Sequence, residues 1–213
     1  MKVCVGLAIP YLLQPIFFPM GESKTPLFSR VSFKANVWIA IFSFIGNYWY
    51  THYFYTVLKA GYTFPSWRFN NIPIPLFFAT HFYFMTYHTF SNIILRKIET
   101  TFEKTWARRI FFWAVVFAFA YFTAFMETLT ISKFPYYGFE DKDMAYKLGS
   151  AFYGIYFIVS FPMFYRVDEG RFAGKYDLHR TVIEAFGAGM IVLCLLDLVR
   201  LWLGVTFEMP GWF

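Results

Sequence analysis

Residues 110–131 read IFFWAVVFAFAYFTAFMETLTI, an apolar run in which Glu127 is the only charged side chain. A helix needs about 20 mainly apolar residues to cross the hydrocarbon of a bilayer. The stretch therefore predicts a transmembrane helix. Five further apolar stretches predict further spans, which gives six in chain order: 3–20, 36–58, 76–95, 110–131, 149–165 and 181–203.

The composition of the whole chain supports this prediction. Hydrophobic residues make up 58% of it and charged residues 15%, against about 45–50% and about 25% in a soluble domain. So few charges cannot cover a soluble fold, and the chain is too apolar to be disordered. Its two cysteines form neither a disulfide framework nor a zinc spacing. We predict an all-α fold, a polytopic membrane helix bundle that forms a single transmembrane domain over residues 1–213.

The loops predict how the bundle is oriented. Twelve Lys and Arg residues lie in the loops after the first, third and fifth spans, and six lie on the opposite side. The positive-inside rule places the twelve in the cytosol and both termini on the far side. Such residues touch lipid headgroups, so no nucleic-acid partner is expected. The first span, interrupted by Pro10, Pro15 and Pro19, lacks a small-residue cleavage site and is predicted to be a kinked anchor.

Ionisable residues inside membrane spans are rare and costly, which makes them candidates for function. With a rise of 1.5 Å per residue, four of them lie about 6–9 Å from the far-side face: His52, His81, Glu127 and Asp197. His88 lies two turns beyond His81 on the same helical face. Asn92 continues that stripe, and Asn47, Thr51 and Thr123 extend similar stripes on their own spans. The pattern predicts a polar-lined pocket inside the bundle.

Each of these groups also has a structural interpretation. A single membrane histidine usually forms hydrogen bonds between helices, and Asp197 and Arg200 at i, i+3 are predicted to pair. Glu127 differs because no Lys or Arg lies within one helical turn of it. An unpaired carboxyl in apolar surroundings tends to be protonated and to donate that proton. His81 and His88 are too far apart to share a metal ion and no H-E-x-x-H motif occurs, so no metal site is expected.

Four stretches of sequence are unusually specific. Residues 34–71 read KANVWIAIFSFIGNYWYTHYFYTVLKAGYTFPSWRFNN, and residues 80–96 read THFYFMTYHTFSNIILR. Residues 127–137 read ETLTISKFPYY, and residues 151–169 read AFYGIYFIVSFPMFYRVDE. Together they resemble the cycloeucalenol cycloisomerase family of sterol biosynthesis, from about residue 31 to residue 205. Members of that family usually carry at least one further hydrophobic segment upstream.

The resemblance implies an isomerase that converts cycloeucalenol, a 9β,19-cyclopropyl sterol, into the Δ8 sterol obtusifoliol. The resemblance implies that the substrate is a sterol and that no redox cofactor takes part. It also implies that the protein lies in the endoplasmic reticulum membrane, among its lipids. A proton must reach C19 and the C8 proton must leave, so the enzyme needs an acid, a base and a dry cavity. Aromatic residues, 25% of the chain, would stabilise the intermediate cation.

We predict Glu127 as the acid, with His81, His88 or His52 as the base or proton relay. The residues predicted to contact the sterol are Asn47, Trp49, Tyr62, Trp67, Asn71, Tyr87 and Asp197. Three other functions use similar features: a membrane protein that binds sterol or lipid without catalysis, a sterol Δ8–Δ7 double-bond isomerase, and a small proton-coupled transporter or channel. The last would show repeats or broken helices in matching halves, and the sequence shows no internal repeat.

Overall fold

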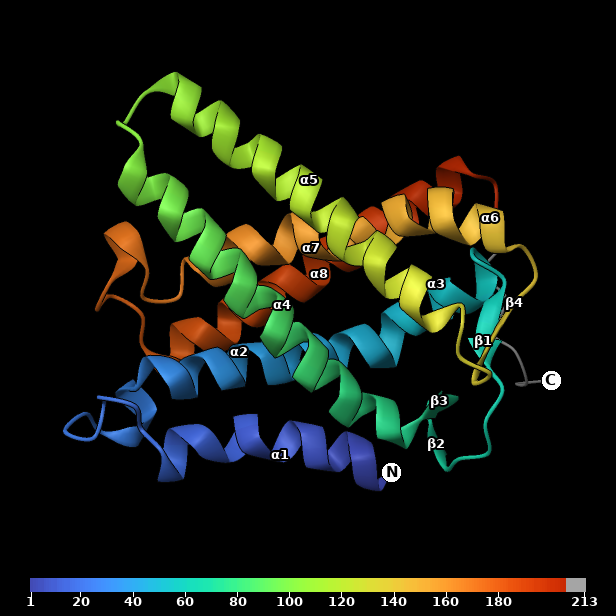
Figure 1. Cartoon of the computed structure of the whole chain (residues 1–213), viewed down its shortest axis with the longest axis horizontal. Coiled ribbons are helices and arrows are strands. Elements are labelled where there is room, and N and C mark those ends of the chain that lie inside the picture. Colours follow the sequence, from blue (N-terminus) through green and yellow to red (C-terminus); the bar gives the residue numbers. More distant parts are fainter. Residues whose placement is uncertain (206–213) are drawn as a thin grey trace.

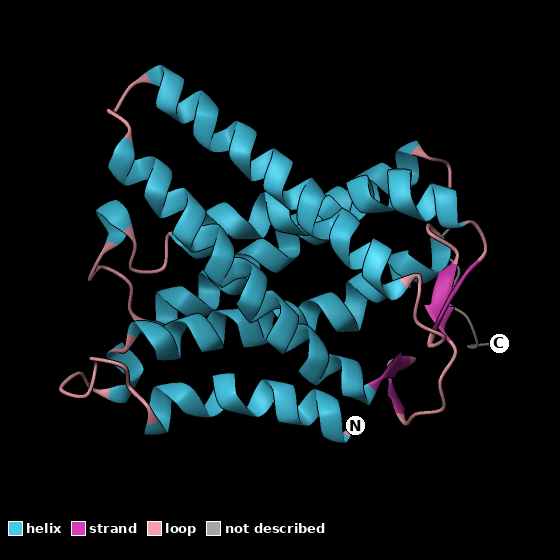
Figure 2. Ribbon diagram, viewed as in Figure 1, coloured by secondary structure: helices cyan, strands magenta, loops and turns pink. Residues whose placement is uncertain are grey.

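Six helical stretches run back and forth through the molecule in the computed structural model, which describes residues 1–205 (Figures 1 and 2). They are α1 (Lys2–Phe17), α2 (Val31–Ile45) with η2 (Gly46–Tyr50) and α3 (Thr51–Thr56), α4 (Ile74–Thr101), α5 (Trp106–Ile131), α6 (Lys142–Met144) with η3 (Ala145–Gly149) and α7 (Ser150–Tyr165), and α8 (Leu178–Trp202). Each predicted span falls on one stretch. The predicted all-α class is confirmed.

Three of these stretches are long and apolar enough to cross a membrane by length and composition: Trp106–Ile131, Lys142–Tyr165 and Leu178–Trp202. Helix α1 is a shorter apolar helix. Side chains on α8 show the arrangement expected in lipid, with small residues inside and large ones outside. Ala185, Ala188 and Gly189 are buried, whereas Met190 and Leu198 are exposed on the opposite face.

The loops alternate between the two ends of the bundle (Figure 1). The loops after α1, α4 and α7 lie at one end, and the amino terminus and the end of α8 lie at the other. The loops after α1, α4 and α7, together with the helix ends that adjoin them, hold the twelve Lys and Arg residues counted in the sequence. Two helices that start at this end are capped by side chains: Thr105 accepts a hydrogen bond from the Arg108 amide, and Asp177 accepts one from the Arg180 amide. Such caps satisfy amides that the first helical turn leaves unpaired.

Close approach of the helices depends on a few small residues. At Gly189 of α8, an added Cβ would lie 2.7 Å from Cδ1 of Ile45, so no larger residue fits there without displacing its neighbour. The Tyr50 hydroxyl donates a 2.6 Å hydrogen bond to the Gly189 carbonyl oxygen. At Gly154 of α7, an added Cβ would lie 3.8 Å from the Ala120 carbonyl oxygen of α5. Thus α2 packs on α8, and α5 on α7, with little side chain between them.

Two short antiparallel sheets close the end of the bundle opposite the basic loops. Strand β1 (Ala60–Tyr62) pairs with β4 (Tyr137–Phe139), with Gly61 opposite Gly138. Strand β2 (Arg68–Phe69) pairs with β3 (Ile72–Pro73). Asn70 and Asn71 join β2 to β3 with φ of 50° and 60°, a left-handed conformation that asparagine tolerates in two-residue hairpins. The sequence analysis predicted neither sheet.

A buried ion pair connects α2 to the loop before α8. The Lys34 ammonium contacts the Asp168 carboxylate, and both side chains are less than 5% exposed. Lys34 also donates a 2.8 Å hydrogen bond to the Tyr176 carbonyl oxygen, and the Tyr176 amide donates to Asp168 at 3.3 Å. The hydrogen bonds compensate part of the cost of burying both charges.

Removing one partner of this pair is expected to be strongly destabilising. Lys34→Met leaves Asp168 buried without its cation, which we expect to lower the free energy of unfolding by about 3–5 kcal/mol. The measurement is thermal or denaturant unfolding of the purified protein in detergent micelles. The double variant Lys34→Met/Asp168→Asn removes both charges and should recover a substantial part of the loss. Equal stability of the two variants would contradict the role assigned to the ion pair.

Candidate functional site

A cavity of about 680 Å³ lies between α4, α5 and α7, next to η2 and the β1–β4 sheet. This volume is within the range of about 300–1,000 Å³ that is usual for small-molecule sites. Nearly half of the lining residues are aromatic: Phe54, Tyr62, Tyr83, Phe84, Tyr87, Phe90, Phe119, Phe122, Phe134, Tyr136, Tyr137, Phe139, Phe152, Tyr153 and Tyr156. The cavity therefore suits a large, flat, mainly apolar ligand.

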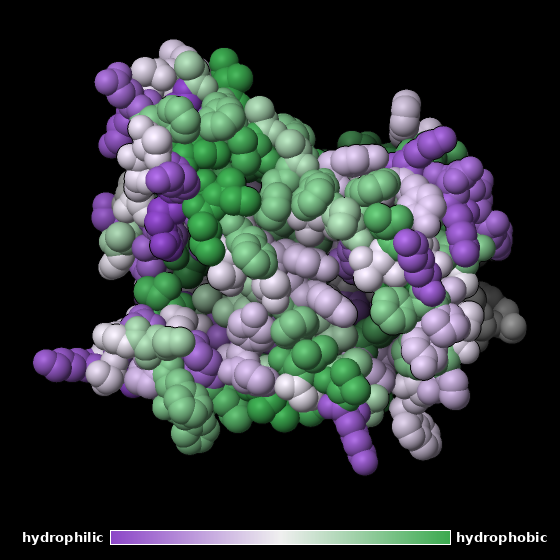
Figure 3. Space-filling view, viewed as in Figure 1, coloured by the Kyte–Doolittle hydropathy of each residue, from purple (hydrophilic) through white to green (hydrophobic). Residues whose placement is uncertain are grey.

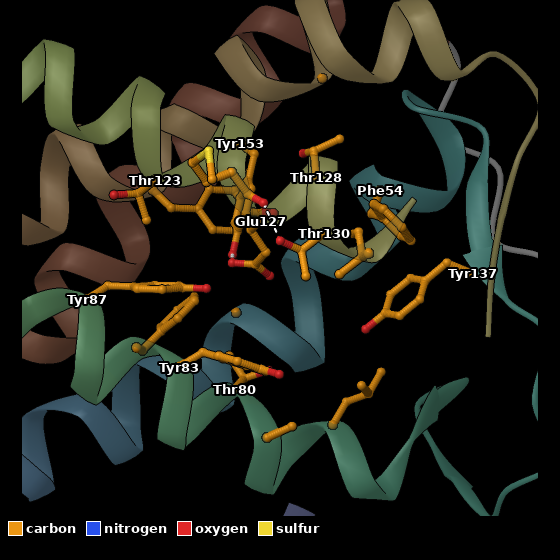
Figure 4. Close-up of a pocket in the computed structure, with 18 of the residues that line it drawn as sticks. Phe54, Thr80, Tyr83, Tyr87, Thr123, Glu127, Thr128, Thr130, Tyr137 and Tyr153 are labelled. Carbon is orange, nitrogen blue, oxygen red and sulfur yellow. Dashed lines mark hydrogen bonds between the residues drawn. The ribbon is translucent and has the colours of Figure 1, made fainter. Parts of the chain in front are cut away.

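Among residues 1–205, Glu127 supplies the only carboxyl group that lines the cavity. It lies near the end of α5, and the Tyr153 hydroxyl of α7 donates a 2.8 Å hydrogen bond to its Oε2 atom. The Tyr87 hydroxyl of α4 points at the same carboxyl group and is near enough to interact with it (Figure 4). Side chains from three helices thus meet at this carboxyl group, which keeps part of its surface open to the cavity.

The electrostatic environment of Glu127 contains no balancing cation. No Lys, Arg or His is among the lining residues, and Glu127 takes part in none of the ion pairs in the described part of the chain. An ionised carboxylate would have only hydroxyl groups to compensate for lost hydration, which is costly in a low-dielectric interior. The arrangement favours a protonated carboxyl group that can give its proton to a bound ligand.

A second polar group of the cavity lies on the π-helical turn η2. The Asn47 side chain donates a 3.0 Å hydrogen bond to the Ser43 carbonyl oxygen and accepts one of 3.2 Å from the Thr80 hydroxyl. Thr51, one turn later, also lines the cavity. The other π-helical turn, η3, contributes Ala145 and Gly149 to the lining. Single π-helical turns inside α-helices are frequent at functional sites.

None of the three predicted histidines lines the cavity. His88 is fully buried, its Nδ1 atom is 2.7 Å from the Phe84 carbonyl oxygen and its Nε2 atom 2.8 Å from the Ser160 hydroxyl. Since a carbonyl oxygen only accepts, Nδ1 carries the proton. His81 Nε2 contacts the Asn36 side-chain oxygen at 3.2 Å. Both nitrogens of His52 are buried, and the Asn70 side chain of the β2–β3 turn is near enough to interact with its ring. Their catalytic role stays a prediction.

The residues predicted to contact the sterol divide into two groups. Asn47, Tyr62 and Tyr87 line the cavity, as Glu127 does. The other four lie elsewhere: Trp49, Trp67, Asn71 and Asp197. Trp67 is 87% exposed, and Asn71 occupies the β2–β3 turn. Asp197 pairs with Arg200 at 2.8 Å, as the i, i+3 spacing predicted, and also accepts a 3.3 Å hydrogen bond from Tyr53.

The sequence analysis missed several groups of this site, above all Tyr153. This residue belongs to the quoted stretch 151–169, but nothing distinguishes it there from Tyr156 or from the surrounding phenylalanines. The contact with Glu127 depends on which face of α7 meets α5. Thr80, Tyr83 and Tyr137 also line the cavity and gave no separate signal in the sequence.

The fold and the site together define a class of protein: a helical membrane bundle that encloses an aromatic cavity with one unpaired carboxyl group. Comparison with known proteins makes the assignment specific. The chain is 41% identical over 244 residues to the cycloeucalenol cycloisomerase of Arabidopsis thaliana, and the match covers 99% of this chain and 84% of that protein. The chain belongs to the cycloeucalenol cycloisomerase family. No family model matches it, and no solved structure does.

The end of the cavity formed by β1 and β4 is expected to respond to high pH. Burial raises the pKa of Tyr62 and of Tyr137, and in both cases neighbouring groups add to the increase. A phenol whose pKa is raised by folding stabilises the fold fully below the unfolded pKa of about 10 and loses this contribution as pH rises above it. Tyr137→Phe should therefore make the fall in the unfolding midpoint above about pH 10 shallower than in the parent protein.

The matched control for this prediction is Tyr136→Phe, because Tyr136 is the neighbouring residue and is 54% exposed. The measurement is the unfolding midpoint as a function of pH for the parent protein and both variants. The control should follow the parent protein throughout. A fall in the midpoint that is equally steep in all three proteins would contradict the prediction.

Proposed function

We propose that this chain is an isomerase that opens the 9β,19-cyclopropane ring of cycloeucalenol and forms the Δ8 sterol obtusifoliol. The observation that carries the proposal is the carboxyl group of Glu127, which lies without a balancing cation in a largely aromatic cavity of about 680 Å³. The name of the Arabidopsis relative supports this activity and substrate. In this proposal the chain works in the endoplasmic reticulum membrane, where its substrate is dissolved among the membrane lipids.

In the first step, Glu127 donates its proton to C19. The electron pair of the C9–C19 bond forms the new C19–H bond, and C9 becomes a carbocation. The hydrogen bond from Tyr153 and the nearby Tyr87 hydroxyl hold the carboxyl group in one orientation. They also stabilise the carboxylate that forms, since a hydrogen bond to an ionised acceptor is roughly twice as strong as one between neutral groups.

In the second step, the C8 proton leaves and its electron pair forms the C8–C9 double bond. We assign its acceptor as the carboxylate that Glu127 became in the first step, because in the described part of the chain no histidine lines the cavity and Glu127 is its only carboxyl group. One proton enters and one leaves, so the product has the mass of the substrate and Glu127 returns to its starting state. The reaction is an intramolecular lyase type of isomerisation, and its electron balance needs no redox cofactor.

The cavity suits the cation that forms between the two steps. Aromatic faces stabilise a nearby cation by about 0.5–2 kcal/mol each where water is excluded. Phe152, Tyr156 and Phe119 belong to the cavity wall. The wall also lacks Lys and Arg, whose positive charge would raise the energy of a carbocation. Apolar walls limit access of water, which would trap the cation as an alcohol.

Replacing Glu127 by Gln tests the acid directly. Glu127→Gln keeps the size and polarity of the side chain but removes the proton that is donated. We expect turnover of cycloeucalenol to fall by about 10²–10⁴-fold while sterol binding changes little. The measurement is product formation by the purified protein in lipid vesicles, followed by loss of the cyclopropyl proton signals at constant mass. A variant that turns over near the parental rate would show that the acid assignment is wrong.

The control for this experiment is Glu140→Gln, which removes an exposed carboxyl group outside the cavity. It should turn over like the parent protein. A parent protein that binds cycloeucalenol without converting it would instead support a sterol-binding protein without catalysis. A product in which the double bond of a Δ8 sterol has moved to Δ7 would support the alternative double-bond isomerase.

His81→Gln distinguishes the proposed base from the predicted histidines. A glutamine amide can keep the hydrogen bond to the Asn36 side-chain oxygen but cannot act as a general base. If the Glu127 carboxylate accepts the C8 proton, turnover by His81→Gln should stay within about threefold of the parental value. The measurement is the same vesicle assay, with unfolding midpoints compared to detect loss of structure. A large loss of turnover in a stably folded variant would restore His81 as the base or proton relay.

A further inference from the structure

Helices α4 and α5 contribute most of the residues of the cavity wall. They pack against each other only at one end. Next to the α4–α5 turn, Leu95, Ile98 and Val116 form a buried apolar cluster with Tyr165. The rings of Phe102 and Phe111 lie 5.4 Å apart at the same end. Towards the other end the helices separate, and α5 follows α7 while α4 runs towards α1 and β3 (Figure 1). The space between α4 and α5 is where the cavity lies.

Residues at this separation belong both to the cavity wall and to the outer surface. Tyr83 and Phe90 of α4 line the cavity and are 43% and 55% exposed. Phe122 and Met126 of α5 line it and are 55% and 41% exposed. Figure 3 shows this face of the molecule hollowed between the two helices. We call these four residues the rim; they mark an opening that joins the cavity to the side of the bundle.

The surface around the rim has the character of a lipid contact. Trp113, Phe117 and Tyr121 continue the exposed face of α5 and are all large and apolar or amphipathic. Phe90 lies six residues from Arg96, the nearest basic residue on α4, which is about 9 Å of helix. Tyr83 lies a further two turns away. If α4 and α5 cross the bilayer as the sequence predicts, these positions fall within the hydrocarbon thickness of about 30 Å, and the opening then faces acyl chains.

At the end of the cavity next to the β1–β4 sheet, aromatic rings line the wall. Tyr62 of β1 and Tyr137 of β4 are paired across the sheet and both line the cavity. Their rings are 5.3 Å apart. Phe134 and Tyr136 also line this end of the cavity and are 51% and 54% exposed. A ligand that arrived from water would have to pass these rings, whereas a ligand dissolved in the bilayer meets the rim directly.

We propose that the sterol reaches Glu127 sideways from the bilayer, through the opening between α4 and α5 that the rim surrounds. This inference rests on the proposed function for the identity of the ligand. Met126 of the rim and Glu127 line the same cavity, so a fused ring system that passes the rim enters the space that the carboxyl group faces. The product leaves by the same opening, and neither sterol crosses an aqueous phase.

Cross-linking across the opening tests the route. The background protein carries Cys4→Ser and Cys194→Ser, because both native cysteines are free thiols. In it, Phe90→Cys/Phe122→Cys places one thiol on each side of the rim, and a cleavable bifunctional thiol reagent joins them. Turnover of cycloeucalenol in vesicles should fall by about tenfold or more when the opening is bridged, and should recover when the reagent is cleaved.

The control pair is Phe102→Cys/Phe111→Cys, which joins the residue after α4 to α5 at a ring contact that already exists and lies outside the cavity wall. The same reagent at the same extent of reaction should leave its turnover unchanged. Full turnover by the bridged Phe90/Phe122 protein would overturn the proposed route.

A second measurement separates this inference from the proposed function. A photoreactive sterol is mixed into the same vesicles, and its attachment to the cavity is quantified by peptide mapping before and after bridging. Bridging at the rim should lower the labelling of α5 and α7, even in a protein that converts no sterol. Unchanged labelling would overturn the route. Absence of turnover in the background protein, with labelling that falls on bridging, would overturn the proposed function alone.

Discussion

The close packing of α5 against α7 is the contact on which the rest of the site depends. Between helices in lipid there is no hydrophobic driving force, so association relies on dispersion and hydrogen bonds at short range. Ala120 and Ala124 of α5 are fully buried, and Gly154 of α7 lies against the Ala120 backbone. Tyr153 adjoins that glycine, and only a short distance between the helices lets its hydroxyl donate to Glu127.

Many polar side chains elsewhere in the bundle find hydrogen-bond partners within it, as membrane helices require, although Trp38 Nε1 and the Ser150 hydroxyl are buried without a partner among residues 1–205. Several threonines donate to the carbonyl oxygen four residues earlier, among them Thr86, Thr89 and Thr128. His88 makes both of its hydrogen bonds inside a shell of aromatic rings that includes Trp38, Phe161 and Phe164. Much of the aromatic quarter of the sequence therefore forms the core of the bundle, and part of it forms the cavity wall.

The sequence was sufficient to locate the helices, because each long apolar run folds as one helical stretch, and three of these stretches are long and apolar enough to cross a membrane. The direction in which each helical side chain points was harder to predict from the sequence. Successive helical residues differ by about 100° in direction, so the predicted stripe of His81 and His88 faces the core while Thr80, Tyr83 and Tyr87 face the cavity. The β1–β4 sheet joins three-residue strands far apart in sequence, which leave no local pattern. Asn71 was chosen for its amide, yet its position reflects the backbone conformation of a turn.

The composition of the cavity wall helps to explain how the proposed reaction can proceed without a proton from water. Proton transfer from a neutral carboxyl group to a hydrocarbon creates a carboxylate and a carbocation side by side, and their attraction is strong where water is scarce. A resident Lys or Arg would weaken that attraction, and none lines the cavity. Because the same carboxylate then takes the C8 proton, no proton has to come from water during the cycle. A site that exchanges only sterol with its surroundings is consistent with a cavity that opens towards lipid.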